Sequence, residues 1–280
     1  MRISRVALGI TLAMGCAWSA AAQGVPKVML IQREYLKPGK AGGAHEKTEG
    51  LFVEAMRRAK WPTNYIGLTS LSGRSRAIFL TSYDSFEAYQ KDGDAAAKNA
   101  VLSASLDKAY ATDGELLESA DQGMFYFHEE MSMNTKTDLS GMRYLEVLLF
   151  HVKPGKEREF AETVKMAKAG YEKGVPAAHW GMFEQVYGGD SGTYILLVSH
   201  KTLDEIDKGF AEGKQFEAAM GEEGMKKFSE LSAASLESIQ QQLFAVNPHM
   251  SYVKEEWIKA DPDFWRPKAA PVKATEEKKP

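Results

Sequence analysis

The stretch "EYLKPGK" at 34–40 returns as "FHVKPGK" at 150–156, and each copy closes an apolar run of strand length. Pro-Gly is a turn signal, so each run is predicted to be a β-strand that ends at this turn. Apolar residues at helical spacing follow both turns, from about 44 to 60 and from 157 to 173. The repeat therefore predicts that one kind of strand–helix unit occurs twice in the chain.

The similarity continues after the first helix of each copy. Two further strand-like runs follow in both, at 61–74 and 77–91 in the first copy and at 175–189 and 194–208 in the second. Long helical patterns come next, near 85–120 and 202–241, and the glycines inside them are expected to mark breaks: Gly93, Gly213 and Gly221. A last strand then leads into a shared Met-Ser, in "MFYFHEEMSMN" (124–134) and "LFAVNPHMSYV" (243–253).

The order strand, helix, strand, strand, helix, strand is that of a ferredoxin-like βαββαβ unit, whose helices cover one face of its sheet. The other face stays bare and needs a partner, and the second copy is the nearest one. We therefore predict an α+β protein in which two tandem units pack sheet to sheet as a pseudo-dimeric barrel within one chain. The predicted boundaries are 23–134 and 143–253 for the units, 135–142 for the linker, and 254–280 for a partly disordered tail.

The βαββαβ pattern with "KPGK" after the first strand and "SFEAYQK" (85–91) after the third resembles the dimeric α+β-barrel superfamily over about 28–253. Within it, the antibiotic-biosynthesis-monooxygenase-like and NIPSNAP-like families are the most similar by pattern. The resemblance implies face-to-face pairing of the units. It leaves the activity open, because the superfamily holds cofactor-free oxygenases, haem-binding enzymes, isomerases and proteins without known activity.

The first 22 residues have the pattern of a secretory signal peptide, with Arg2 and Arg5 before an apolar run and "SAAAQ" as a cleavage site after Ala22. Export to the periplasm or the extracellular space is the expectation, with lipidation at Cys16 as an alternative. Cys16 is the only cysteine, so no disulfide is predicted in the mature chain. A net charge of −3 argues against a nucleic-acid partner, and no second long apolar segment predicts a membrane span.

Three positions carry tyrosine in the first copy and histidine in the second, all at strand ends: Tyr35 with His151, Tyr65 with His179, and Tyr83 with His200. Strands one and three of each unit are expected to be parallel neighbours, so the three histidines are predicted to share one edge of the second sheet and the three tyrosines the matching edge of the first. The histidines could then hold a transition metal, or one of them could act as a general base. The alternative is that polar aromatic side chains simply cap strands where they meet water.

Other candidates are polar side chains on strands and on the first helix. His128 and Glu130 share a strand face, and one of Arg33 and Glu34 is expected to point into the barrel. His45 and Glu49 lie four apart on a helix, which is interpreted as a surface pair. In the resembled superfamily a helical histidine can ligate haem, and His45 is the one such candidate. Aromatic residues are further candidates for the lining of a ligand cavity, including Phe125, Tyr126, Phe127, Phe150, Trp180 and Phe183.

No nucleophile elbow, P-loop or dinucleotide fingerprint appears in the sequence. We therefore favour a secreted protein that binds a small organic molecule in the cavity between the sheets, without turnover and without a cofactor, and that is free to form a homo-oligomer. The second hypothesis is a cofactor-independent or metal-assisted monooxygenase or isomerase acting in the same cavity.

Overall fold

A computed structural model describes residues 25–266. The signal-peptide prediction at 1–22, with Cys16, and the disorder expected beyond Arg266 lie outside these residues. Among the helices of this described part, none has the length and apolar character needed to cross a membrane.

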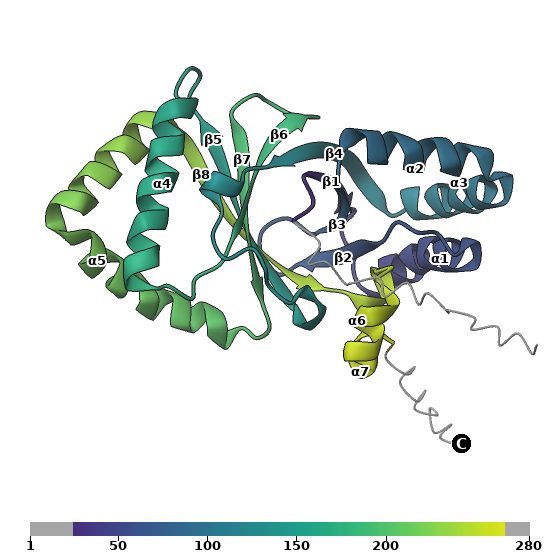
Figure 1. Cartoon of the computed structure of the whole chain (residues 1–280). Helices are drawn as coiled ribbons and strands as arrows, with labels where there is room; N and C mark the ends of the chain where they lie inside the picture. The colour runs from purple at the N-terminus through teal and green to yellow at the C-terminus, as the bar shows by residue number, and fades with distance from the viewer. Residues whose placement is uncertain (1–24, 267–280) are drawn as a thin grey trace, which may run out of the picture.

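Both units have the predicted order of elements (Figure 1). The first consists of β1 (Val28–Leu36), α1 (Gly43–Ala59), β2 (Tyr65–Ser70), β3 (Arg76–Tyr83), α2 (Phe86–Lys98), α3 (Ala100–Gly114) and β4 (Leu117–Phe127). The second consists of β5 (Tyr144–Val152), α4 (Glu157–Gly174), β6 (Gly181–Tyr187), β7 (Thr193–His200), α5 (Asp204–Ser235) and β8 (Leu236–Val246). Short helices complete the fold: η1 (Glu129–Met131), η2 (Leu139–Gly141), η3 (Pro248–Met250), α6 (Glu255–Ala260) and α7 (Pro262–Trp265).

Only one of the three expected glycine breaks occurs. Gly221 leaves the helical region with a φ of 68° and kinks α5, a conformation that glycine adopts without steric cost. Gly93 and Gly213 lie inside α2 and α5, so the predictions for them were wrong. The break in the first unit falls at Asn99, whose side chain accepts a 3.0 Å hydrogen bond from the backbone N–H of Leu102 and caps α3.

The eight strands form one antiparallel sheet that closes into a barrel in the order β1-β3-β2-β8-β5-β7-β6-β4. The units join at their edges, where β2 pairs with β8 and β4 pairs with β6. The prediction of two sheets stacked face to face was therefore wrong in this respect. Edge pairing satisfies the backbone groups that two separate sheets would leave unpaired. The helices lie on two opposite flanks of the barrel, α1 to α3 on one and α4 and α5 on the other (Figure 1).

The barrel interior is filled by one hydrophobic cluster to which every strand contributes. Alternate residues of each strand point inward, as the period of two requires. Fully buried members include Leu68, Phe125 and Phe244. At one end, Trp257, Phe264 and Trp265 of α6 and α7 pack against the same cluster, so the C-terminal segment closes that end of the barrel.

Each unit sends its last segment across the other unit. After β4, the hydroxyl of Ser132 accepts a 2.9 Å hydrogen bond from the backbone N–H of Met182 on β6. After β8, the hydroxyl of Ser251 accepts a 2.9 Å hydrogen bond from the backbone N–H of Gly67 on β2. Gly67 has no room for a side chain, because an added Cβ would lie 2.3 Å from the carbonyl oxygen of Met250. The shared Met-Ser thus marks two reciprocal crossings that hold the units together.

Candidate metal centre

Glu34 points away from the barrel interior, toward the helices of the first unit. Its neighbours in the interior cluster on β1, Met29 and Ile31, have odd numbers, so even-numbered residues lie on the helix side. Glu34 is only 3 % exposed there. Of the two charges expected to divide between the faces, Arg33 is therefore the one on the barrel side.

Helix α1 supplies two more polar groups to the same place. His45 and Glu49 are 1 % and 3 % exposed, and they lie on one helical face with Phe52 and Val53, which are also buried. Their interpretation as a surface pair was wrong. The chain enters α1 through Gly42, which has a φ of 81°, so the helix begins directly after the turn that ends β1.

Asp113, in the last turn of α3, completes a cluster of four buried side chains with Glu34, His45 and Glu49. One ligand atom from each lies within 4.8 Å of all the others. The three carboxylates surround a single imidazole nitrogen, because His45 Nε2 is 3.0 Å from Glu34, 3.5 Å from Asp113 and 3.7 Å from Glu49. Three carboxylates and one imidazole therefore lie close enough together for all four to contact a single ion.

Neighbouring side chains fix two of the carboxylates. Gln32 donates a 2.8 Å hydrogen bond from Nε2 to Oε1 of Glu34, and it comes from the same face of β1. The Thr48 hydroxyl contacts Oδ1 of Asp113. Such supporting contacts orient the ligands of metal sites.

The electrostatics of the cluster are unfavourable as long as it holds no cation. Burial raises the pKa of Glu49 to about 10, and the charges of Glu34 and Asp113 add to the shift. Burial also raises the pKa of Asp113, although its hydrogen bond with Thr48 opposes the change. Carboxylates that share a dry site cannot all ionise unless a positive charge compensates them. A divalent cation would provide that charge.

The hydrogen bonding of Glu49 is a second observation that favours a cation at this site. Oε1 of Glu49 is buried and has no hydrogen-bond partner among the described residues, although it lies inside the cluster. Buried acceptors in folded proteins are nearly always paired. The position that would pair Oε1 is the one enclosed by His45 Nε2 and the other two carboxylates.

The four residues fit a small cation and do not fit haem. Ligand atoms at about 2.0–2.3 Å from one ion lie at most about 4.5 Å apart, close to the separations here. Imidazole with several carboxylates suits Mn²⁺, Fe²⁺ or Zn²⁺. Haem needs room for a planar macrocycle beside the histidine nitrogen, and three buried carboxylates lie 3.0–3.7 Å from His45 Nε2. The haem role considered for His45 is therefore not supported by this geometry.

Two aromatic side chains lie near the cluster, and one of them is partly exposed to solvent. Phe52 and Tyr110 form an edge-to-face pair with ring centroids 4.8 Å apart. Tyr110 is 54 % exposed. The pKa of its hydroxyl is nevertheless raised, first by partial burial and then by the negative charges of Glu34 and Glu49. Tyr110 thus lies between the buried acids and water.

The histidines predicted to converge do not. β5 and β7 are antiparallel, and the register places His151 opposite Thr193 and His200 opposite Tyr144, at opposite ends of the pair. His179 contacts the carbonyl oxygen of Ser199 at 2.9 Å, near His200. The error was the assumption that strands one and three are parallel. The three-histidine metal site is excluded by this geometry, and separate roles for His151, His179 and His200 stay predictions.

The matching tyrosines are divided in the same way. Tyr35 lies opposite Arg76, at one end of the barrel, whereas Tyr83 lies opposite Val28, at the other. The Tyr83 hydroxyl donates a 3.1 Å hydrogen bond to Asp92. Tyr65 is on the helix side of β2, where its hydroxyl is buried without a hydrogen-bond partner in the described structure. Burial raises its pKa, and the charge of Glu49 acts in the same direction.

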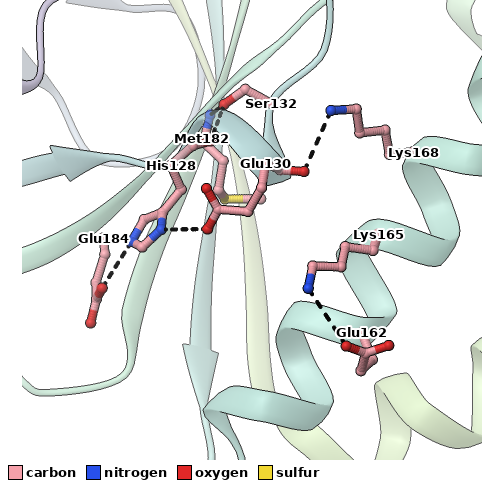
Figure 2. Close-up of polar contacts among 8 residues, drawn as sticks. All are labelled: His128, Glu130, Ser132, Glu162, Lys165, Lys168, Met182 and Glu184. Atoms are coloured by element: carbon pink, nitrogen blue, oxygen red, sulfur yellow. Dashed lines mark hydrogen bonds and ion pairs between the residues drawn. The ribbon is translucent and has the colours of Figure 1, made fainter.

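The prediction that His128 and Glu130 share a strand face was wrong, because β4 ends at Phe127 and Glu130 lies in η1; the two side chains meet at the seam between the units. Figure 2 shows the His128 ring between two carboxylates, with Nδ1 3.0 Å from Glu130 and Nε2 2.9 Å from Glu184 of β6. Lys168 of α4 reaches the carbonyl oxygen of Glu130 at 3.4 Å. The contacts join the end of β4 to the second unit. Glu130 is 56 % exposed, so this group lacks the burial that marks the cluster around His45.

The remaining aromatic candidates belong to the packing of the chain. Phe183, Phe125 and Phe127 are part of the barrel core. Phe150 packs on the helix side of the second unit, with its ring centroid 5.5 Å from that of Phe160. Trp180 is buried and donates a 2.8 Å hydrogen bond to the carbonyl oxygen of Met131.

Comparison with solved structures identifies the fold. A "Putative monooxygenase" from Fusobacterium nucleatum superposes with a TM-score of 0.53 at 11 % identity, over 80 % of this chain and 93 % of its own. A "putative monooxygenase" from Lactobacillus acidophilus gives 0.50 at 9 % identity, over 79 % and 94 %. An "anthrone oxidase-like protein" gives 0.49 at 9 % identity, over 84 % and 96 %. No family model and no curated protein sequence matches the chain.

The chain therefore has the dimeric α+β-barrel fold, as the resemblance implied, and the NIPSNAP-like assignment within it stays a prediction. The preferred function, a small-molecule-binding protein without turnover, is contradicted. The structures that share the fold are named as monooxygenases, and the barrel interior that was to hold the ligand is occupied by the hydrophobic core. The alternative, an oxygenase or isomerase, agrees better with these findings, although the barrel interior is not its site.

Proposed function

We propose that the protein is a metal-dependent oxygenase that acts on a small organic substrate, with its metal bound by Glu34, His45, Glu49 and Asp113. The observation that carries this proposal is the convergence of three buried carboxylates on one imidazole nitrogen, with one carboxylate oxygen left unpaired. The monooxygenase names of the fold neighbours direct the choice of reaction to be tested.

The chain provides the features that such a centre requires. The four ligands come from three elements, β1, α1 and α3, so they are held from different directions. A bound Mn²⁺ or Fe²⁺ would supply Lewis-acid and one-electron chemistry. Tyr110 provides a hydroxyl group on the solvent side that can orient or protonate a substrate oxygen.

Access would be through α3. Only Leu102, Ala109 and Asp113 of its fifteen residues are buried, so few apolar contacts hold the helix in place. A small outward movement of α3 would uncover the centre beside Tyr110. We also propose that the protein acts outside the cytoplasm, on the strength of residues 1–22, and that its units arose by duplication, on the strength of their shared order and Met-Ser.

The first test is metal binding by the full-length protein. Protein purified without chelator is analysed for metals by mass spectrometry, then stripped with EDTA and titrated with Mn²⁺ and with Zn²⁺ by calorimetry. We expect about one ion per chain, and at least a hundredfold weaker binding in Glu49→Gln, which keeps the shape of the side chain and loses its charge. His128→Gln is the control, because His128 also lies between two carboxylates but at the surface. A wild-type protein that binds neither metal would overturn the proposal.

The second test is turnover. Dioxygen uptake is followed with the Fe²⁺-loaded and the Mn²⁺-loaded protein and a panel of phenols, hydroquinones and anthrones. Uptake should require metal and a substrate, and Glu49→Gln should abolish it. Tyr110→Phe should lower the rate while metal binding is unchanged. Equal uptake by stripped and loaded protein would contradict a metal-dependent reaction.

A further inference from the structure

The barrel end opposite α6 and α7 carries an arginine that has no acidic partner among residues 25–266. Arg76 begins β3 and lies on the same face as Ile78 and Leu80, which belong to the barrel core. It is 9 % exposed, and its guanidinium carbon lies 5.1 Å from the ring centroid of Phe244. Nη2 is buried and makes no hydrogen bond to any described residue.

The nearby acidic groups are already used by two other arginines. Arg33 forms an ion pair with Asp121, and Arg74 forms one with Glu118 at 2.7 Å. We call Arg33, Tyr35, Arg74 and Arg76 the arginine mouth, after their place at the barrel end where β1 finishes and β3 begins. Arg74 lies over the ring of Tyr35 at 4.4 Å. Two of the three arginines are therefore paired with a carboxylate, and the positive charge of Arg76 is in excess.

A buried charge without a partner is costly, and no ion pair to Arg76 occurs among residues 25–266. Burial lowers the pKa of Arg76, and the charges of Arg33 and Arg74 act in the same direction. The fold does not require this charge, because the second unit begins the equivalent strand β7 with Thr193, which is also buried. The arginine is thus a feature of the first unit alone.

We propose that Arg76 binds the carboxylate of a small, planar organic anion at the arginine mouth. A guanidinium group presents two parallel N–H donors that match a carboxylate, which a threonine or lysine cannot do. The Arg76 guanidinium lies over the ring of Phe244 and the Arg74 guanidinium over that of Tyr35. The outer faces of these planar groups can stack on the ring of such a molecule. An aromatic carboxylate has both parts.

This site is separate from the metal centre. Glu34 lies on the helix side of β1, whereas Arg33 and Tyr35 lie on the barrel side of the same strand. Binding at the mouth should therefore not depend on a metal. The two proposals can fail independently, since one is tested with metal ions and the other with anions on EDTA-stripped protein.

The test uses benzoate as the probe, with acetate and inorganic phosphate as comparisons. Calorimetry and thermal unfolding are measured on the full chain after EDTA treatment. We expect saturable benzoate binding with an increase in Tm, and weaker binding of acetate, which has no ring. Arg76→Gln should weaken benzoate binding at least tenfold. Arg76→Lys should weaken it several-fold, because lysine lacks the two parallel N–H donors of the guanidinium group.

Arg58→Gln is the matched control, because Arg58 is exposed and pairs with Glu54 on the surface of α1. It should bind benzoate like the wild type. If Arg76→Gln does not fold, Arg76→Lys keeps the charge and decides the question. Wild-type protein that binds neither benzoate nor acetate, or an Arg76→Lys protein with unchanged affinity, would overturn the proposal. Tighter binding of phosphate than of benzoate would also overturn it, because a phosphate site needs no ring surface.

Discussion

Each unit packs its first helix on the outer face of the barrel, α1 on one flank and α4 on the opposite flank, and the two helices bury different chemistry beneath them. Taking "KPGK" as the common reference, Glu34 corresponds to Phe150, His45 to Ala161 and Glu49 to Lys165. Under α4, Phe150 and Ala161 pack against a hydrophobic cluster that contains Phe160, Val164 and Tyr194. Lys165 is half exposed and pairs with Glu162 at the surface.

The second unit shows that this fold needs no charge at these positions. Replacing buried ionic groups by apolar ones is often neutral or stabilising, so the polar cluster of the first unit is costly to maintain in the absence of a ligand. Such costs are typical of functional sites. The comparison thus supports the proposed metal centre in the first unit, because the second unit packs apolar side chains at the matching place.

The largest effect on stability is expected from a substitution in the hydrophobic cluster under α4 of the second unit. Phe160→Ala removes a ring that is 1 % exposed and contacts Phe150 and Tyr194. We expect a loss of about 3–5 kcal/mol in the free energy of unfolding, because the cavity cannot fill. Chemical denaturation measures it. Metal binding in the first unit should stay unchanged under native conditions, and a loss of metal binding would show that the units are not divided as described.

The second-largest effect is the pH dependence of stability that the buried acids of the first unit should cause. In the metal-free protein the folded state keeps the proton of Glu49 up to a pKa of about 10, whereas the unfolded chain loses it near 4.5. The folded state therefore binds more protons between these values, and stability falls as the pH rises, by about 1.4 kcal/mol per pH unit for one proton. Glu49→Gln should remove this slope.

Denaturation of EDTA-treated protein between pH 5 and 8 tests the prediction. The variant should gain stability relative to the wild type as the pH increases. Lys165→Gln, at the equivalent place in the second unit, should leave the slope as it is. A wild-type profile without a slope would mean that Glu49 is ionised in the folded protein.

The smallest effect should be equal in the two units. Ser132→Ala and Ser251→Ala each remove the acceptor of a buried backbone N–H, that of Met182 or that of Gly67. Each should cost about 1–3 kcal/mol, the usual penalty for an unpaired buried donor. Unequal losses, measured by denaturation, would show that one crossing contributes more than the other.

The architecture could be read from the sequence because it depends on local signals. Pro-Gly turns and helical spacing around residues such as Phe52 and Phe160 give the order of elements directly. The closure of the barrel depends on which edges meet, and no local pattern encodes this. The strand direction was also missed, and with it the separation of His151 from His200.

The metal centre was missed although part of its signal was present. His45 and Glu49 share a helical face with Phe52 and Val53, and a polar pair on the apolar face of a helix indicates burial. Glu34 could be placed beside them only once its side of β1 was known. Asp113 comes from the far end of α3, about 64 positions after Glu49, and only the packing of α3 on α1 shows the contact.

The crossing of the last segments has a consequence for synthesis of the chain. β2 is synthesised early, but the strand and the turn that pair with its free edge, β8 and Met250–Ser251, are synthesised near the end of translation. Until then the nascent first unit presents an open strand, the kind of edge that pairs with other chains. The sheet closes only when β8, the last strand, pairs with β2 of the first unit. If the two units were expressed as separate chains, each would therefore have unpaired strand edges.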